Sequence, residues 1–247
     1  MKPQNVKFSI IIVCKNSIKT INKSIDSVIN QNFKNFELIV IDGDSTDGTK
    51  EFLLSKEKFI SKFISEKDTG ISNAFNKGIS IANGEWLFFL NSDDYLKSNN
   101  TLNDVAEQLD IDMNIIIGRV QLINNKKKMI GEFGGDAINF NKMTYYNIIP
   151  HQATFIKKKL FKNNGYDESL SYSMDYEFYW KNKNNLKIKL INNKIAIVNN
   201  KGASAQNYLK LFYEYALIQR KYNVNSFFII RINFLYRILK YYIKNHI

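Results

Sequence analysis

Apolar and polar positions follow two different periods along the first hundred residues. Short apolar runs, typical of strands buried on both faces of a sheet, alternate with segments whose apolar residues have helical spacing. The predicted strands cover residues 8–13, 36–41, 59–64 and 86–90. The predicted helices cover residues 18–32, 71–82 and a short stretch from residue 49. This order predicts an α/β fold with a mostly parallel sheet and right-handed crossovers.

The pattern changes after about residue 110. Two strand-like runs at 115–123 and 129–133 flank Asn-Asn-Lys-Lys-Lys, which predicts a hairpin. Further strands are expected at 153–156 and 188–198, the second interrupted at Asn192-Asn193, and a helix is expected at 206–222. No repeat and no flexible linker between domains is evident.

Polar groups follow each of the first four predicted strands. They are Lys15-Asn16, Asp42-Gly43-Asp44, residues 65–70, and Asn91 to Asp94. In open α/β sheets, ligands bind outside the carboxyl ends of the strands, so these groups are expected to share one binding edge. The adjacent Asp93 and Asp94 suit a divalent cation beside phosphates. Taken alone, the pair is more typical of a solvated turn with an Asx cap.

Composition indicates a globular chain with 45% hydrophobic and 23% charged residues among 247. The single cysteine, Cys14, excludes an internal disulfide bond and is expected to fill the core, which fits a reducing compartment. The apolar run at 8–14 is too short for a signal peptide or a membrane span, so a cytoplasmic location is expected.

The net charge of +12 is concentrated near the end of the chain, where residues 201–247 carry eight basic residues against the single acid Glu214. Residues 226–247 combine aromatic residues with a polar face formed by Asn233, Arg237, Lys240 and Lys244. Such an amphipathic helix suits the surface of an anionic membrane. The alternatives are packing on the rest of the chain or on a second subunit of a homodimer.

Four segments together carry a resemblance to a known family. They are FSIIIVCKN at 8–16, FELIVIDGDSTDGT at 36–49, SEKDTGISNAFNKGISIANGEWLFFLNSDD at 65–94, and GYDESLSYSMDYEFYWK at 165–181. In this order and spacing the chain resembles the family 2 glycosyltransferases, in particular the branch that builds bacterial surface polysaccharides such as O-antigen and capsule. The resemblance implies a GT-A fold with helices on both faces of the sheet and a nucleotide-diphosphate sugar as donor.

The resemblance also implies roles for individual residues. Asp93 would bind a divalent metal, Mn²⁺ or Mg²⁺, and Asp175 would be the general base. The nucleotide-sugar donor would be held by Val13, Lys15, Asp42, Asp44, Asp68, Gly70, Asn73, Asn76, Asn91 and Ser92. His151 would contact the diphosphate or the acceptor. Asn91 and Asn73 stand where relatives often have Asp, and Asp42-Gly43-Asp44 replaces a frequent Asp-Asp-Gly. Asn91 and Asn73 each remove one negative charge from the site compared with those relatives.

The implied activity is inverting transfer of a sugar, by default from a UDP-sugar with thymidine donors as the alternative, to a glycan or a polyprenyl-diphosphate-linked acceptor. Residues 1–205 would form the catalytic domain, with a nucleotide-binding half at about 1–110 and an acceptor-binding half at about 111–205. Residues 206–247 would form basic helices at the inner face of the cytoplasmic membrane. No nucleic-acid partner is implied.

Several alternatives remain open from the residues alone. A nucleotidyltransferase also uses an α/β sheet with acidic metal ligands, although the usual glycine-rich basic loop after the first strand is CKNSIKT here. A nucleic-acid-binding module could use the basic C-terminal segment but leaves the acidic edge unexplained. Asp175 could instead be the N-cap of a helix at 176–183, and a lone His151 is most often structural.

Overall fold

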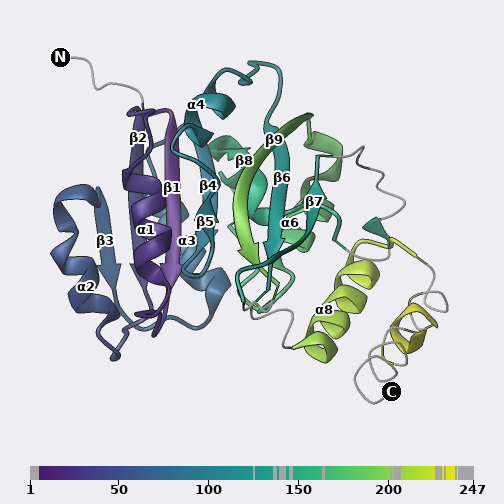
Figure 1. The fold of residues 1–247 in the computed structure, drawn as a ribbon. Coiled ribbons are helices and arrows are strands. Elements are labelled where there is room, and N and C mark those ends of the chain that lie inside the picture. Colours follow the sequence, from purple (N-terminus) through teal and green to yellow (C-terminus); the bar gives the residue numbers. More distant parts are fainter. Residues whose placement is uncertain are drawn as a thin grey trace.

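The computed structural model describes residues 6–124, 126–135, 138, 143–144, 147–162, 165–200, 202, 207–225, 230, 232–236 and 238. Over these residues the chain forms one nine-stranded sheet with helices on both faces (Figure 1). The strand order is β3-β2-β1-β4-β8-β6-β9-β5, with β7 paired to β6. This architecture is the α/β fold that the alternating pattern predicts.

The first four strands are parallel: β1 (Phe8–Cys14), β2 (Phe36–Asp42), β3 (Lys62–Ser65) and β4 (Trp86–Asn91). The predictions for β1, β2 and β4 are confirmed to within a residue or two. The third predicted strand was placed too early, because Glu57–Phe59 is a 3₁₀ turn and β3 begins only at Lys62. Even the apolar Phe59 is 45% exposed, since the turn points it away from the core.

Alternate residues of the strands enter two separate cores. Ile10 and Ile12 of β1 pack under α1 (Ile21–Ile29), with α2 (Thr49–Ser55) and α4 (Thr101–Ala106) on the same face. Ile11 and Val13 face α3 (Ile71–Ile81), whose side of the sheet also receives α6 (Met174–Asn182) and α8 (Tyr208–Lys221). Gly78 allows α3 to lie close to β1, because a Cβ there would come within 2.5 Å of the Ile11 side chain.

The later strands are of mixed direction. The hairpin is confirmed as β6 (Ile115–Ile123) and β7 (Met129–Gly134), while β8 (Thr154–Lys157) runs antiparallel to both β4 and β6. β9 (Ile188–Asn199) runs parallel to β6, and its far end pairs with the short β5 (Tyr95–Leu96). The register between β6 and β9 shifts where Asn192-Asn193 interrupt the apolar pattern, so that interruption marks an irregularity within one strand.

The C-terminal helix α8 packs against α6 and extends the core on that face. Ile218 of α8 is buried in the core, and Lys221 at its end pairs with Glu177 of α6 at 2.9 Å. The amphipathic helix predicted for 226–247 lies largely outside the described residues. Within that range, residues 232–236 are described and are helical. Among the residues that the structure describes, no helix has the length and apolarity needed to cross a bilayer.

The amino ends of the parallel strands are closed by one buried carboxylate. Glu37 of β2 accepts hydrogen bonds from Ser9 Oγ at 2.6 Å and Gly84 N at 3.2 Å, and it pairs with Lys62 Nζ at 3.1 Å. Burial alone would raise the pKa of Glu37, but the hydrogen bonds and the Lys62 charge outweigh burial and lower it. At this end of the sheet the protein itself supplies the hydrogen-bond donors and the cation that the Glu37 carboxylate needs.

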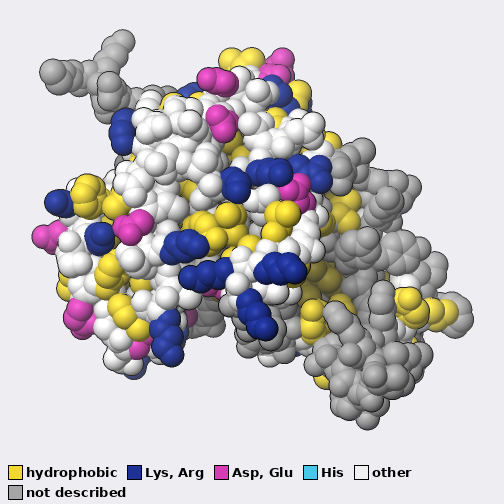
Figure 2. Space-filling model, viewed as in Figure 1, with side chains coloured by type: hydrophobic (Ala, Val, Ile, Leu, Met, Phe, Trp, Pro, Cys, Tyr) yellow, Lys and Arg dark blue, Asp and Glu magenta, His cyan; other side chains and the backbone are white. Residues whose placement is uncertain are grey.

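Basic side chains are not confined to the C-terminal segment. On the face seen in Figure 2, Lys and Arg side chains gather across the middle of the molecule, among neutral and hydrophobic surface. The described domain therefore carries part of the net charge of +12 on one of its own faces.

Candidate active site

The strand register gathers the predicted polar groups at one edge of the sheet. Val13 at the end of β1 pairs with Ile41 on one side and with Asn91 on the other. A cavity of about 1550 Å³ opens at this edge. That volume exceeds the range usual for a single small ligand and leaves room for two substrates. The predicted site residues that line it are Val13, Lys15, Asp68, Gly70, Asn91, Ser92, Asp93, His151 and Asp175.

The two adjacent aspartates after β4 have different surroundings. Asp94 is buried, and its carboxylate accepts hydrogen bonds from Asn91 Nδ2 at 2.9 Å and Asn199 N at 3.2 Å. Asp93 lines the cavity, and no other described residue donates a hydrogen bond to its carboxylate. Burial raises the pKa of both groups, and for Asp94 the neighbouring Asp93 charge adds to the effect. Asp93 therefore faces the cavity while Asp94 joins β4 to β9.

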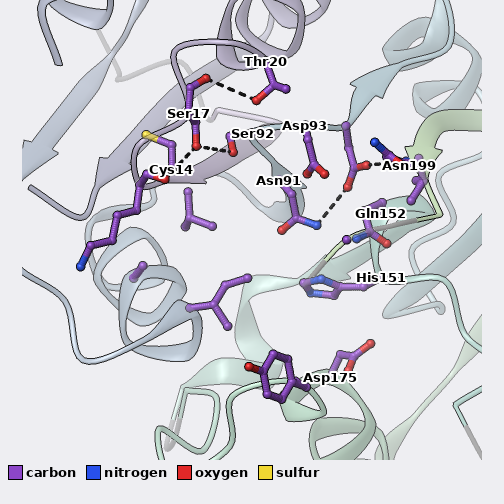
Figure 3. Close-up of a pocket in the computed structure, with 18 of the residues that line it drawn as sticks. Cys14, Ser17, Thr20, Asn91, Ser92, Asp93, His151, Gln152, Asp175 and Asn199 are labelled. Atoms are coloured by element: carbon purple, nitrogen blue, oxygen red, sulfur yellow. Dashed lines mark hydrogen bonds between the residues drawn. The ribbon is translucent and has the colours of Figure 1, made fainter. Parts of the chain in front are cut away.

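Asp175 faces the same cavity from the opposite side of the sheet edge. Figure 3 shows it below His151, whereas Asp93 lies above. Its carboxylate accepts hydrogen bonds from Asn147 Nδ2 at 2.6 Å and from Tyr176 N at 2.8 Å. Burial raises the pKa of Asp175 to about 6, although these hydrogen bonds oppose the shift. A carboxylate with this pKa is ionised at neutral pH and still basic enough to accept a proton.

The alternative prediction that Asp175 is the N-cap of this helix was wrong. The N-cap of α6 is Ser173, and Asp175 is already inside the first turn of the helix. It therefore lies at the positive end of the helix dipole, where its Oδ1 accepts a hydrogen bond from Tyr176 N, and it lines the cavity.

His151 is buried and forms part of the cavity wall. Its ring stacks on Phe89 with a centroid distance of 5.1 Å, and Nε2 lies 2.8 Å from the Tyr166 hydroxyl. Burial lowers the pKa of His151 to about 3, so the imidazole is neutral at physiological pH. A contact of His151 with the diphosphate or acceptor stays a prediction, and it would be made by a neutral ring.

Two predicted residues of β2 and its loop do not line the cavity. Asp42 is fully buried, and its carboxylate accepts hydrogen bonds from the hydroxyls of Ser45 at 2.5 Å and Ser65 at 2.8 Å. Asp44 is exposed and has a positive φ of 61°. Asp42 therefore fixes the loop after β2, and the contact with the base or ribose predicted for Asp42 and Asp44 stays a prediction.

Asn73 and Asn76 on α3 also differ from the expectation that they shape the cavity wall. Asn73 Nδ2 donates to Glu168 at 3.0 Å, and Asn76 donates to the Tyr166 carbonyl at 2.9 Å. Asn76 Oδ1 accepts from Tyr166 N at 2.7 Å. Both side-chain amides hold the segment before α6 against α3, and neither residue lines the cavity.

Some cavity residues had no signal in the sequence. Asn147, which orients Asp175, lies in an irregular segment without periodicity. Leu211 and Tyr215 of α8 line the cavity, although the helical pattern places them only on some face of a helix. Gln152 also lines it, and its side chain acts to lower the pKa of Asp94 against the effect of burial. These residues reach the cavity from segments that are distant in sequence, so a local sequence pattern does not predict that they line it.

The residues at the edge fit a metal shared with a substrate. No three His, Cys, Asp or Glu side chains among the described residues come together to hold a metal by protein ligands alone. Mg²⁺ usually takes only one or two carboxylates, with substrate phosphates and water completing its coordination. The Asp93 carboxylate, turned to the cavity with no side-chain partner among the described residues, suits that kind of site.

Comparison with known families identifies the chain from nearly its whole length. Residues 9–238 match Glycosyl transferase family 2. The chain belongs to this family. The membership decides in favour of a glycosyltransferase over the nucleotidyltransferase and the nucleic-acid-binding module that the residues alone left open.

Individual relatives agree with that membership. The UDP-Glc:alpha-D-GlcNAc-diphosphoundecaprenol beta-1,3-glucosyltransferase WfgD of Escherichia coli is 33% identical over 140 residues, which are 55% of this chain and 54% of that protein. The chain therefore aligns with only about half the length of this curated relative.

Solved structures show the same fold. S. aureus TarS in complex with UDP-GlcNAc superposes with a TM-score of 0.68 at 20% identity, covering 86% of this chain and 66% of that one. The mannosyltransferase PcManGT from Pyrobaculum calidifontis, in complex with GDP-Man and Mn²⁺, superposes with a TM-score of 0.65 at 15% identity, covering 89% and 65%. The family 2 glycosyltransferase described here therefore has the expected GT-A fold.

Proposed function

We propose that this protein is an inverting glycosyltransferase that transfers a sugar from a UDP-sugar to a hydroxyl group of a lipid-linked glycan in bacterial surface polysaccharide synthesis. The observation that carries the proposal is the shared cavity: Asp93 and Asp175 line it from different elements. The donor class is supported by the UDP-GlcNAc complex of the fold neighbour TarS, and the acceptor class by the printed activity of WfgD.

The donor would bind at the strand-end side of the cavity. Lys15, Ser92 and Asp93 lie there, on the loops that follow β1 and β4. A divalent ion held by Asp93 and the donor diphosphate would supply positive charge to the leaving phosphate oxygens. Asp68 fixes the turn before α3, since its carboxylate accepts from Gly70 N at 3.1 Å, and so shapes this side of the cavity.

The acceptor would bind on the Asp175 side. Asp175, held by Asn147 and by the amide of Tyr176, accepts the proton of the acceptor hydroxyl as that oxygen attacks the anomeric carbon. One base and a direct displacement imply inversion at that carbon. Ile149 and Met174, with Leu211 and Tyr215, make this part of the wall apolar, which excludes water that would compete as acceptor.

The test is a direct assay of donor use. Purified protein with Mn²⁺ is incubated with a panel of UDP-, dTDP- and GDP-sugars and a polyprenyl-diphosphate-linked sugar acceptor. Release of nucleoside diphosphate is coupled to product analysis by mass spectrometry. We expect product with a UDP-sugar and the opposite anomeric configuration by NMR. Retention of configuration, or no release from any UDP-sugar, would refute the proposal.

A further inference from the structure

Glu214 is the one acid in the basic C-terminal segment 201–247, and it is buried in α8 with 3% exposure. Its carboxylate accepts four hydrogen bonds. Oε1 accepts from Ser171 N at 2.9 Å. Oε2 accepts from Tyr172 N at 2.9 Å, Ser173 N at 3.0 Å and Ser173 Oγ at 2.8 Å. A single carboxylate thus holds three consecutive backbone amides and one hydroxyl.

These groups immediately precede the helix that carries Asp175. Ser173 is the N-cap of α6, and its hydroxyl caps no amide of that helix because it donates to Glu214 instead. The first amides of a helix lack partners within it and favour a negative charge nearby. Besides Asp175 and Glu177 in its own first turn, α6 has a third negative charge nearby, the Glu214 carboxylate, which lies 41 residues after Ser173 and bonds the three amides directly before the helix. The start of α6 is therefore fixed by α8.

A second contact between the same helices lies away from the cavity. Glu177 of α6 pairs with Lys221 Nζ at 2.9 Å and accepts a hydrogen bond from the Tyr222 hydroxyl. None of these three residues lines the cavity, whereas Ser171 and Tyr172 do. Tyr176 of α6 also meets α8, through a hydrogen bond from Gln219 Nε2 at 3.3 Å and a ring contact with Tyr215 at 4.7 Å. Among these contacts, the one made by Glu214 holds the residues directly before α6, of which Ser171 and Tyr172 line the cavity.

We propose that Glu214 is a positioning residue for Asp175. By holding residues 171–173, it fixes the first turn of α6 in the arrangement that presents the Asp175 carboxylate to the cavity. This inference rests on the proposed function of Asp175 as general base. Misplacing a reacting group by about 1 Å costs on the order of 10²-fold in rate. The donor side is built from loops after β1 and β4, so donor binding should not depend on Glu214.

The experiment compares Glu214→Gln with Lys221→Met in the full-length chain. The first variant keeps the side-chain shape but loses the charge and one acceptor, and the second removes the ion pair at the other contact. For Glu214→Gln we expect kcat to fall about 10- to 100-fold while the donor KM changes less than about twofold. For Lys221→Met we expect kcat to be unchanged. Thermal unfolding of both variants measures the structural effect separately.

A double variant tests whether Glu214 acts through Asp175. Because residues that act as a unit are not additive, Glu214→Gln should cause no further loss of transfer in an Asp175→Asn background. Glu214→Asp, which keeps the charge on a shorter side chain, provides a second measurement if the amide variant does not fold. It should also lower kcat at constant donor KM.

Three results would overturn the inference. They are an equal effect of Glu214→Gln and Lys221→Met on kcat, an unchanged kcat in a folded Glu214→Asp protein, and a further tenfold loss in the double variant. Failure of the proposed function gives a different result, since transfer would then survive Asp175→Asn itself. If Asp175→Asn is inactive while both Glu214 variants keep wild-type kcat, only the positioning role is refuted.

Discussion

The two ends of the parallel strands place buried or half-buried carboxylates in opposite situations. At the amino ends, Glu37 has several hydrogen-bond donors and an ion pair, and its pKa is lowered. At the carboxyl ends, Asp93 and Asp175 face a cavity with fewer donors, and burial raises the pKa of each. Both ends belong to one sheet, so the difference comes from what surrounds each carboxylate.

This contrast separates stability from activity. A carboxylate whose partners are all supplied by the protein stabilises the fold in its charged form. A carboxylate without enough partners is less stable as a charge until a proton, a cation or a substrate arrives. The carboxyl-end edge therefore holds the groups whose full partners are expected only in the substrate complex, and four measurements can test the comparison.

The largest effect is expected for Asp175→Asn. The amide keeps the shape but cannot accept the acceptor proton, so transfer should fall about 10²- to 10⁴-fold. Nucleotide binding, measured by calorimetry, should be retained. Asp167→Asn is the matched control, because Asp167 lies in the same segment but pairs with Lys221 outside the cavity. Near-normal transfer by Asp175→Asn would remove the base from the mechanism.

The next effect is expected for Asp93→Asn. Loss of this carboxylate should weaken the metal-dependent stabilisation of the leaving diphosphate and lower kcat about 10²- to 10³-fold. Wild-type protein treated with EDTA should fall to a similar level, and EDTA should have little further effect on the variant. Full wild-type activity after exhaustive EDTA treatment would contradict a metal role for Asp93.

At the other end of the sheet, Glu37→Gln should reduce stability and leave the chemistry intact. Removing a charged acceptor of buried donors should lower the free energy of unfolding by about 1.5–3 kcal/mol. Because the pKa of Glu37 is lowered, its contribution is present above the unfolded pKa of about 4.5 and is lost as pH falls through the folded pKa. Urea unfolding at pH 7 measures the loss.

The matched control at that end is Glu85→Gln. Glu85 pairs with Lys7 at 2.7 Å but is 38% exposed, so its loss should change the unfolding free energy by less than about 1 kcal/mol. An equal effect of both variants, or a loss of kcat in folded Glu37→Gln, would end the proposed division between the two ends.

The smallest effect is the pH dependence of transfer. The base must be ionised to accept a proton, so kcat/KM should decline below the raised Asp175 pKa of about 6. At pH 5 and saturating Mn²⁺ the rate should be about tenfold lower than at pH 7.5. A profile that stays flat down to pH 5 would show that the group responsible has an ordinary carboxyl pKa.

Local pattern predicted one part of this protein well. Because parallel strands bury both faces, β1, β2 and β4 are continuous apolar runs, and the polar residues after them fall at one edge by the geometry of crossovers. That reasoning placed Lys15, Ser92 and Asp93 at the cavity. The same reasoning did not show that Asp42 and Asp93 differ in exposure to the cavity, because both lie at strand ends. Only the tertiary structure shows that the Asp42 carboxylate is buried and bonded to Ser45 and Ser65.

The sequence by itself determined the alternating fold, the family and the edge of the sheet where the chemistry-bearing residues collect, because these depend on periodicity and on short segments. Tertiary structure decided which carboxylates face the cavity. It also decided that α8 packs against the start of α6, the helix that contains Asp175. Those outcomes depend on burial and hydrogen bonds between residues far apart in the chain, such as Glu214 with Ser173. A local pattern records that Glu214 is a lone acid among basic residues, but only packing supplies its partners.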